Sequence, residues 1–371
     1  MQILALNSTR AWGGAEVWFS QFCTGMAERG HEVTLVCHPT SELQRRFADH
    51  GRVRTANVAI RAEVNPIRVF QLAELFRRLR PDILVAHRPK DVKLCAAAIR
   101  LAGPMPLVHV KQSGEMLKDR FDYRWAWKNS VSAMAVVSYE NLDRLRDDAP
   151  WLGRMPVVVI HNAVNTDRYR PLPEERERVR RELDISSGEC VASYHGRLAA
   201  PKRVDLVIRA LAAVAQEVSV QGLIIGDGPE GPSLRKLAQR LAAPVLFTGR
   251  RDDIPELLSA ADVEITMSEI EGAPLAVIEA MACGLPVIAS GATSHPEVVS
   301  DGESGLLVEP GKSEGAARAI LELARDPERQ AVLGAAARER AVEHFGSNGM
   351  LDRYEAFLEE VVLQRPTRAR P

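Results

Sequence analysis

The sequence lacks every cysteine arrangement that is typical of disulfide frameworks or zinc sites. Its five cysteines, among 371 residues, stand singly in apolar surroundings, with no CxxC pair and no histidine at zinc-site spacing. This distribution favours a reducing compartment and buried thiols. No apolar run approaches the ~20 residues of a membrane-spanning helix, and the opening MQILALNSTR has no basic lead-in. We therefore expect a cytoplasmic protein that neither crosses a membrane nor is exported.

The chain also lacks an overall excess of charge of one sign, and we expect no nucleic-acid partner. Its net charge of -1 conceals an asymmetry, because basic side chains outnumber acidic ones in the first 165 residues and the reverse holds afterwards. Hydrophobic residues make up 46% and charged residues 26%, which is ordinary for a soluble globular protein. A chain of 371 residues exceeds what one hydrophobic core usually serves, so two domains are expected.

Short β-rich runs alternate with longer segments of helical spacing, a pattern that predicts βαβ units and parallel sheets covered on both faces. The predicted strands are QILAL, HEVTLVC, PDILVAH, PLVHV, AMAVVS and PVVVIHN, and later ECVASYHG, VQGLIIGDG, PVLFTG, DVEITMS, LPVIAS and SGLLVEP. The pattern restarts after the connector NTDRYRPLPEERERVRREL. The expected fold class is α/β, with two Rossmann-like, doubly wound parallel sheets, one in residues 1–165 and one in residues 166–346. A last helical segment, at about residues 347–365, is predicted to pack back on the first domain.

Glycine-containing turns that open helices follow several predicted strands. Such turns place backbone N–H groups and the positive end of a helix dipole at the carboxyl edge of the sheet, where phosphate ligands bind. Gly13 and Gly14 precede a helix that begins near Ala15, and the alternative is a tight turn that needs glycine. The segment GDGPEG (226–231) matches GxGxxG, but Pro229 within the turn argues against a nicotinamide or flavin site.

Two carboxylates interrupt the apolar segment SEIEGAPLAVIEAMACGLPVIAS, residues 268–290. A proline near its start and a glycine at its end predict a helix over about residues 273–283. Glu271 then lies in the loop before the helix, and Glu279 lies about 8 Å along the helix axis. The two acids could hold hydroxyls on either side of a phosphate at the helix start. The alternative is a solvated loop acid and a helix acid paired with a base.

The segment HGRLAAPKR follows another predicted strand. It supplies Arg197 and Lys202, a guanidinium fork and a point charge that are both suited to a diphosphate. Either residue could instead form a surface ion pair.

Together these segments resemble the retaining nucleotide-sugar glycosyltransferases of family 4, the group 1 glycosyl transferases, whose GT-B fold has two Rossmann-like domains with an interdomain cleft. The matching segments occur in the family's order and cover most of the chain. They are GGAE (13–16), HNAVNTDRY (161–169), GRLAAPKR (196–203), GDGPE (226–230), FTGRRDDIPELLSAAD (247–262), EGAPLAVIEAMACGLPV (271–287) and HPEVVSDGESGLLV (295–308).

The resemblance implies a role for each matching residue. Glu279 would hold the nucleotide ribose, and Glu271, the first acid of an E-x7-E motif, would lie beside the transferred sugar. Arg197 and Lys202 match the pair that binds the diphosphate. The remaining donor-binding candidates are Gly14, through close backbone approach, the backbone of Ala273, Pro274 and Leu275, and, as a looser match near the base, Arg250 and Asp252.

The implied activity is that of a hexosyltransferase-type enzyme. It would move a sugar, with retention of configuration, from a UDP-, GDP- or ADP-sugar in the second domain to a saccharide or lipid-linked saccharide acceptor in the first. Negative charge grows on the departing phosphate, where Arg197, Lys202 and helix starts could stabilise it. Because the chain has no Asp-x-Asp triplet of the metal-dependent sugar transferases, we expect no metal site and no cofactor.

One departure from the family concerns the first domain. A histidine usually follows the strand that matches PLVHV and points into the cleft. Lys111 or Gln112 falls there in this sequence, and His109 lies earlier. His87, at the end of DILVAH, is another candidate for a catalytic role in substrate handling, against a purely structural one.

Two other functions share this architecture, a sugar-nucleotide epimerase or hydrolase and a non-catalytic nucleotide-binding scaffold. Bacterial members of the family often build lipopolysaccharide, capsule or lipid-linked glycans, and an envelope glycan is expected here. Basic and aromatic residues mix in NPIRVFQLAELFRRLRP and KDRFDYRWAWKN. We therefore hypothesise peripheral contact with an anionic membrane, at the inner face of the cytoplasmic membrane. The alternative is that the helix buries its apolar stripe on the sheet and exposes its basic residues to solvent. We expect a monomer or a dimer.

Overall fold

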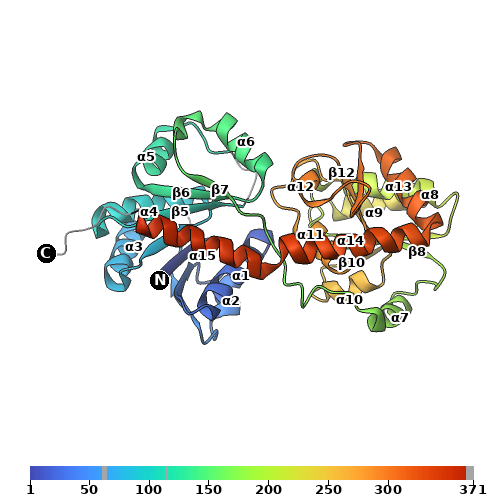
Figure 1. Ribbon diagram of the computed structural model, residues 1–371, viewed down its shortest axis with the longest axis horizontal. Helices are drawn as coiled ribbons and strands as arrows, with labels where there is room; N and C mark the ends of the chain where they lie inside the picture. Colours follow the sequence, from blue (N-terminus) through green and yellow to red (C-terminus); the bar gives the residue numbers. More distant parts are fainter. Residues whose placement is uncertain (61–64, 113–115, 365–371) are drawn as a thin grey trace. The chain divides into compact units, whose positions relative to one another are not determined.

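The computed structural model describes residues 1–60, 65–112 and 116–364, and the chain divides into two compact units (Figure 1). The first unit comprises Met1–Asn162 and the chain from Asn348 onward, and the second comprises Ala163–Ser347. An isolated parallel bridge joins Val164 to Gly346. The two passages of the chain out of the second unit therefore run side by side.

A seven-stranded parallel sheet forms the centre of the first unit, in the order β3-β2-β1-β4-β5-β6-β7. Its strands are β1 (Gln2–Asn7), β2 (Glu32–Cys37), β3 (Val53–Asn57), β4 (Ile83–Ala86), β5 (Leu107–Lys111), β6 (Val131–Val136) and β7 (Val157–Val159). Its helices are α1 (Gly14–Glu28), α2 (Glu42–Phe47), α3 (Pro66–Leu79), α4 (Pro89–Ala102), α5 (Phe121–Ser130), α6 (Tyr139–Asp148), the 3-10 turn η1 (Pro150–Leu152) and α15 (Ser347–Leu363).

Apolar side chains fix the helices of this unit against the sheet. Helices α3, α4 and α5 contribute buried residues such as Leu72 and Trp127 to one core, because their apolar positions recur at helical spacing. Helix α15 packs on α1, where the ring centroids of Trp18 and Tyr354 lie 5.1 Å apart. A side chain at Gly25 would collide with Leu351, since a Cβ there would lie 2.3 Å from it. The last helix therefore belongs to the first unit.

A six-stranded sheet forms the centre of the second unit, in the order β10-β9-β8-β11-β12-β13. Its strands are β8 (Cys190–His195), β9 (Val220–Ile225), β10 (Val245–Gly249), β11 (Val263–Thr266), β12 (Val287–Ser290) and β13 (Gly305–Val308). Its helices are α7 (Pro173–Glu182), the 3-10 turn η2 (Ala200–Lys202), α8 (Val204–Val214), α9 (Gly231–Leu241), α10 (Ile254–Ser259), α11 (Leu275–Ala282), α12 (His295–Val298), α13 (Ser313–Arg325) and α14 (Pro327–Phe345).

Successive residues of the second sheet point into two separate cores. Val191 packs in the core that α11 and α14 cover, whereas its neighbour Ala192 packs in the core that α8 and α13 cover. Burial on both faces is the usual state of a parallel sheet and explains why its strands read as apolar runs. All residues of β11 and β12 are buried, including Glu264 in β11.

The strand orders locate one point in each sheet at which the chain reverses its direction of winding. These points lie between β1 and β4 in the first unit and between β8 and β11 in the second. In open α/β sheets, ligands bind outside the carboxyl ends of the strands at such points. The two α/β parallel-sheet units confirm the predicted fold class, whereas β3 has no counterpart among the strands predicted from sequence. None of the helices in the described ranges is long and apolar enough to span a bilayer.

Candidate active site

Two loops meet at the carboxyl edge of the second sheet, one after β8 and one after β11. The backbone N–H of Glu269 donates to the carbonyl of Pro201 at 2.9 Å, and the Arg203 guanidinium pairs with the Glu269 carboxylate. Because β8 and β11 are paired neighbours, these loops start from adjacent points of the sheet. The arrangement places the segment of Lys202 against that of Glu271.

Lys202 and Glu271 form an ion pair between these loops. Lys202 ends the turn η2 and Glu271 precedes α11. The two side chains retain 28% and 13% of their exposure, so the pair is shielded but reachable from solvent. The predicted loop acid is thus not simply solvated, because its partner is the cation that the sequence assigns to the diphosphate.

Glu279 lies in α11, about one helix turn after the helix start at Leu275, and contacts a different basic residue. Its Oε2 lies 3.0 Å from Nε2 of His195, the last residue of β8. The other ring nitrogen, Nδ1, lies 3.0 Å from Oε1 of Glu264 in β11. Burial and the adjacent Glu279 carboxylate raise the pKa of Tyr169, whose side chain also faces this helix. The Glu279 side chain keeps 15% of its exposure, so it remains partly accessible to solvent.

The other two cationic candidates are exposed. Arg197 follows β8, and its carbonyl accepts a hydrogen bond from the Tyr194 hydroxyl at 3.2 Å. Arg250 follows β10. Neither side chain makes a hydrogen bond or an ion pair to any residue in the described part of the chain. Both guanidinium groups are therefore available to a ligand at this edge.

Helix α11 begins two residues later than predicted. It starts at Leu275, and Pro274 takes the N-cap position with φ -82° and ψ 68°. The N–H of Leu275 donates to the carbonyl of Ala273 at 2.9 Å. Residues 273 to 275 thus form the entry to the helix, between Glu271 and the turn that carries Glu279.

The segment GDGPE has a packing role that explains its glycines. Gly226 has φ +137°, and a Cβ there would lie 1.9 Å from the carbonyl oxygen of Gly196. A Cβ at Gly228 would lie 2.3 Å from the carbonyl oxygen of Leu198. Backbone hydrogen bonds from Leu198 to Asp227 and from Glu230 to Leu198, each 3.0 Å, join the same two loops. This segment therefore holds the Arg197 loop in place.

Two further candidates belong to the first unit. Gly14 begins α1 and is exposed. His87 follows β4 and is buried, with Nδ1 at 3.2 Å from the carbonyl oxygen of Val110. Burial lowers the pKa of His87 to about 4, so its ring is neutral at neutral pH. Gly14 and His87 thus follow the strands at that unit's reversal point, while the other site candidates lie in the second unit.

The residues near the expected histidine position are buried as well. Nδ1 of His109 accepts a hydrogen bond from the indole N–H of Trp127 at 3.2 Å, and its Nε2 donates to the carbonyl of His87 at 3.1 Å. Its hydrogen-bonding capacity is used within the fold. Gln112 accepts a hydrogen bond from Asn162 at 2.8 Å, and its own Nε2 is buried without a hydrogen-bond partner among the residues that the structure describes.

Sequence reasoning missed His195 and Glu264. A signal for both was present, since each is an ionisable histidine or acid in a strand with no other such residue, and strands of a parallel sheet are buried on both faces. A buried carboxylate needs a partner. The pairing of β8 with β11, which supplies that partner, required the strand order.

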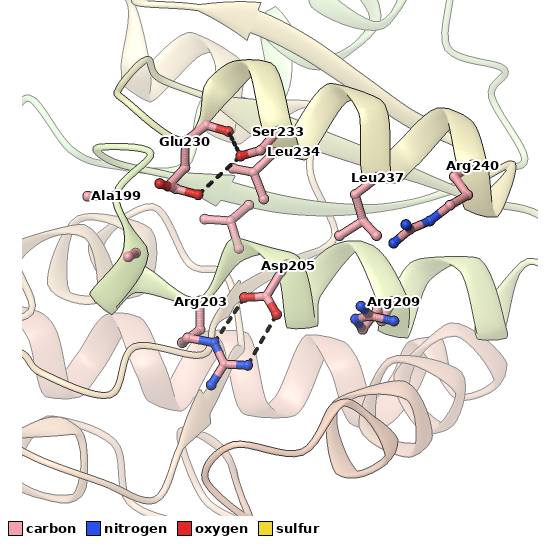
Figure 2. Close-up of a pocket in the computed structure, with 11 residues that line it drawn as sticks. Ala199, Arg203, Asp205, Arg209, Glu230, Ser233, Leu234, Leu237 and Arg240 are labelled. Atoms are coloured by element: carbon pink, nitrogen blue, oxygen red, sulfur yellow. Dashed lines mark hydrogen bonds and ion pairs between the residues drawn. The ribbon is translucent and has the colours of Figure 1, made fainter.

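A cavity of about 380 Å³ lies beside this region, between α8 and α9 (Figure 2). Arg203 and Asp205 are joined across two hydrogen bonds on one wall, and Ser233 bonds Glu230 on another. None of the predicted donor-binding residues lines this cavity. Within the described residues, no group of three or more histidines, cysteines or acids is placed to hold a metal ion.

Two protein-family models match the chain. The model of Glycosyltransferase Family 4 matches residues 12–168, and that of Glycosyl transferases group 1 matches residues 175–340. The chain is a family 4 glycosyltransferase. The E-x7-E segment, the Lys202 loop and the GDGPE segment all fall within the second match.

Individual relatives of this glycosyltransferase act on different molecules. The chain is 28% identical to N-acetyl-alpha-D-glucosaminyl L-malate synthase of Bacillus anthracis, over 94% of each chain. It is 33% identical to the GDP-mannose-dependent monoacylated alpha-(1-6)-phosphatidylinositol monomannoside mannosyltransferase of Corynebacterium glutamicum, over 74% of this chain and 75% of the relative.

A solved structure shares the fold of the glycosyltransferase. HepE (Alr3699) from Anabaena, crystallised with UDP-glucose, superposes with a TM-score of 0.84 at 23% identity, over 97% of this chain and 100% of HepE. The two parallel-sheet units thus form a GT-B fold, as the sequence predicts.

Proposed function

We propose that this glycosyltransferase takes its sugar from a nucleoside diphosphate sugar held by the second unit. The observation that carries the proposal is the Lys202–Glu271 pair at the reversal point of the second sheet, just before the helix α11 that carries the partly exposed side chain of Glu279. The GT-B protein HepE, which was crystallised with UDP-glucose, supports this class of donor. The nucleoside is UDP, GDP or ADP.

Each charged group has a role that its surroundings favour. Arg197 and Lys202 bind the diphosphate, and Lys202 leaves Glu271 to do so. Negative charge then grows on the phosphate oxygen that leaves the anomeric carbon, and fixed cations stabilise it most strongly in the transition state. Glu271, released from Lys202, lies beside the transferred sugar. Glu279 accepts hydrogen bonds from the ribose hydroxyls. No metal ion is required for these steps.

Further donor contacts come from the start of α11 and from Arg250. The backbone at Ala273, Pro274 and Leu275 faces the sugar and phosphates at the start of α11, where the helix dipole is positive. Arg250 lies near the base. His87, neutral and buried, contributes to substrate handling as an uncharged group.

Transfer proceeds with retention of configuration, and the acceptor is a saccharide or a lipid-linked saccharide of the bacterial envelope. The mannosyltransferase relative is named for a phosphatidylinositol mannoside, which supports a lipid-linked acceptor. The malate synthase relative gives a second acceptor class, a small organic acid. An assay with both acceptor classes and the same donor distinguishes them.

A thermal-shift screen with UDP, GDP and ADP tests the donor proposal. Binding to the folded state raises the melting temperature by mass action, so one nucleotide should raise it well above the others. The Glu279→Ala variant is the matched control and should show a reduced shift. Turnover of the corresponding nucleotide sugar only when an acceptor is present supports a transferase. Product without an acceptor supports an epimerase or hydrolase, and binding without turnover supports a scaffold.

We also propose that the first unit contacts anionic membrane surfaces. Phe121 and Ile67 are 85% and 66% exposed, at the starts of α5 and α3, and basic residues such as Arg120 and Lys118 lie beside Phe121. Trp127, by contrast, is fully buried, so the aromatic content of that segment serves the core. Co-sedimentation with anionic vesicles at low salt, weakened by Phe121→Ser and absent with neutral vesicles, is expected. No sedimentation with anionic vesicles would contradict the proposal.

A further inference from the structure

The Glu279 carboxylate is the end of a chain of three hydrogen-bonded side chains. His195 lies between two carboxylates, with Nε2 at 3.0 Å from Glu279 and Nδ1 at 3.0 Å from Glu264. His195 and Glu264 are buried, with side chains 5% and 1% exposed, whereas Glu279 is 15% exposed. Only the outermost of the three groups can therefore touch a ligand.

The geometry determines the charge of the imidazole. A neutral ring has one N–H, and one of its two carboxylate neighbours would then face a lone pair. Burial alone would lower the pKa of His195, but the carboxylates of Glu264 and Glu279 outweigh burial and raise it to about 10. His195 is therefore a histidinium that donates to both carboxylates.

Glu264 is the fixed end of this chain of hydrogen bonds. Its Oε1 also accepts the backbone N–H of His195 at 3.0 Å, and its Oε2 accepts the hydroxyl of Ser193. Ser193 is the residue that pairs with Glu264 in the register of β8 and β11. Because these partners are set by the sheet, Glu264 has little freedom to move, and His195 transfers that constraint to Glu279 on α11.

We propose that His195 and Glu264 are positioning residues, which hold the Glu279 carboxylate in the orientation that receives two ribose hydroxyls. This inference rests on the proposed function, because it takes Glu279 to be the ribose ligand. Without the histidinium, the Glu279 side chain would have other rotamers available and would lose the charge partner that offsets its partial burial. We expect His195 and Glu264 to affect the discrimination between ribose and deoxyribose, and not the binding of the diphosphate.

Calorimetric titration of the full chain with a nucleoside diphosphate and with its 2′,3′-dideoxy counterpart measures the discrimination between ribose and deoxyribose. The ratio of the two dissociation constants is the quantity compared below. The nucleotide used is the one that gives the largest thermal shift. The wild type should prefer the ribonucleotide by about tenfold or more, since hydrogen bonds to a charged group are lost in the dideoxy compound. Glu279→Ala should reduce this ratio to near one. His195→Phe, which keeps a ring but removes both donors, should reduce it nearly as far although Glu279 is present.

Two further variants separate positioning from a loss of stability. Glu264→Gln retains the shape of the side chain but removes its charge, so it should lower the pKa of His195 measured by NMR and reduce the ratio in part. Asp262→Asn weakens another ion-pair network of the second unit, in which Asp262, just before β11, bonds Arg176 and Arg180 of α7. This control should lower the melting temperature and leave the ratio unchanged.

The outcomes are distinct. A reduced ratio in His195→Phe and Glu264→Gln, with an unchanged ratio in Asp262→Asn, supports the positioning role. A wild-type ratio in either folded His195 or Glu264 variant, while Glu279→Ala loses it, overturns this inference and leaves the proposed donor site standing. A wild type that binds no nucleoside diphosphate, or binds both compounds equally, overturns the donor role of Glu279 and this inference with it.

Discussion

Replacement of Glu271 by Gln should strengthen nucleotide binding while it weakens catalysis. In the unliganded chain, Lys202 is paired with Glu271, and a diphosphate must draw Lys202 away. The substitution removes the competing charge but retains the size of the side chain. Lys202 then meets the phosphates without first breaking an ion pair.

The burial of the pair sets the magnitude. Side chains that are 28% and 13% exposed lie between a surface ion pair and a buried one. A pair of this kind contributes about 1 kcal/mol, which corresponds to a factor of about five in a dissociation constant. We therefore expect Glu271→Gln to bind the nucleoside diphosphate about fivefold more tightly, and its turnover to fall because the carboxylate beside the sugar is lost.

Calorimetry at low salt gives the dissociation constants, and release of nucleoside diphosphate at saturating donor gives kcat. Glu279→Ala is the comparison, because it should lose affinity and turnover together. If Glu271→Gln lost as much nucleotide affinity as Glu279→Ala, the division of roles between the two acids would be wrong.

Three other predictions address the cations, the loop packing and the first unit. Lys202→Ala should cost several kcal/mol of transition-state stabilisation, mostly as a lower kcat. Wild-type activity should survive EDTA, and activity that EDTA abolishes and added magnesium restores would contradict the metal-independent mechanism. Gly226→Ala should destabilise the second unit by about 3 kcal/mol, because its φ of +137° suits only glycine and a Cβ would meet Gly196; Gly188→Ala, where φ is not positive and a Cβ meets no described atom within 4 Å, is the control for unfolding experiments. His87 has a pKa lowered to about 4, so the unfolded chain binds more protons between pH 6.5 and 4 and stability is lost as pH falls through that window; His87→Gln should melt with a shallower acid dependence.

The strands of both units could be predicted because a parallel sheet buried on both faces has apolar runs of the right length. The exception, β3, reads VRTAN and is an edge strand whose side chains are mostly polar and partly exposed. It belongs to the sheet through backbone pairing with β2, and such pairing produces no hydrophobic pattern in the sequence. The start of α11 was misplaced because Pro274 suits both a first turn and the position before it.

The candidate site was predicted only in part, for a physical reason. Glu271, Lys202 and Glu279 lie in segments with recognisable turns and spacings. The partner of each acid depends on which strands are neighbours. That order brings Lys202 to Glu271 and His195 to Glu279, although 69 and 84 residues separate them in the sequence. His87 and Gly14, predicted with the others, lie in the first unit, at its own reversal point.

A crystal structure of the full chain with the nucleoside diphosphate that gives the largest thermal shift tests the central claim most directly. We predict diphosphate oxygens within hydrogen-bonding distance of Lys202 Nζ and the Arg197 guanidinium, with the Lys202–Glu271 pair separated. We also predict ribose hydroxyls on the Glu279 carboxylate, with His195 still hydrogen-bonded to it. A nucleotide that lies elsewhere, or that leaves the Lys202–Glu271 pair and the Glu279 carboxylate untouched, would contradict it.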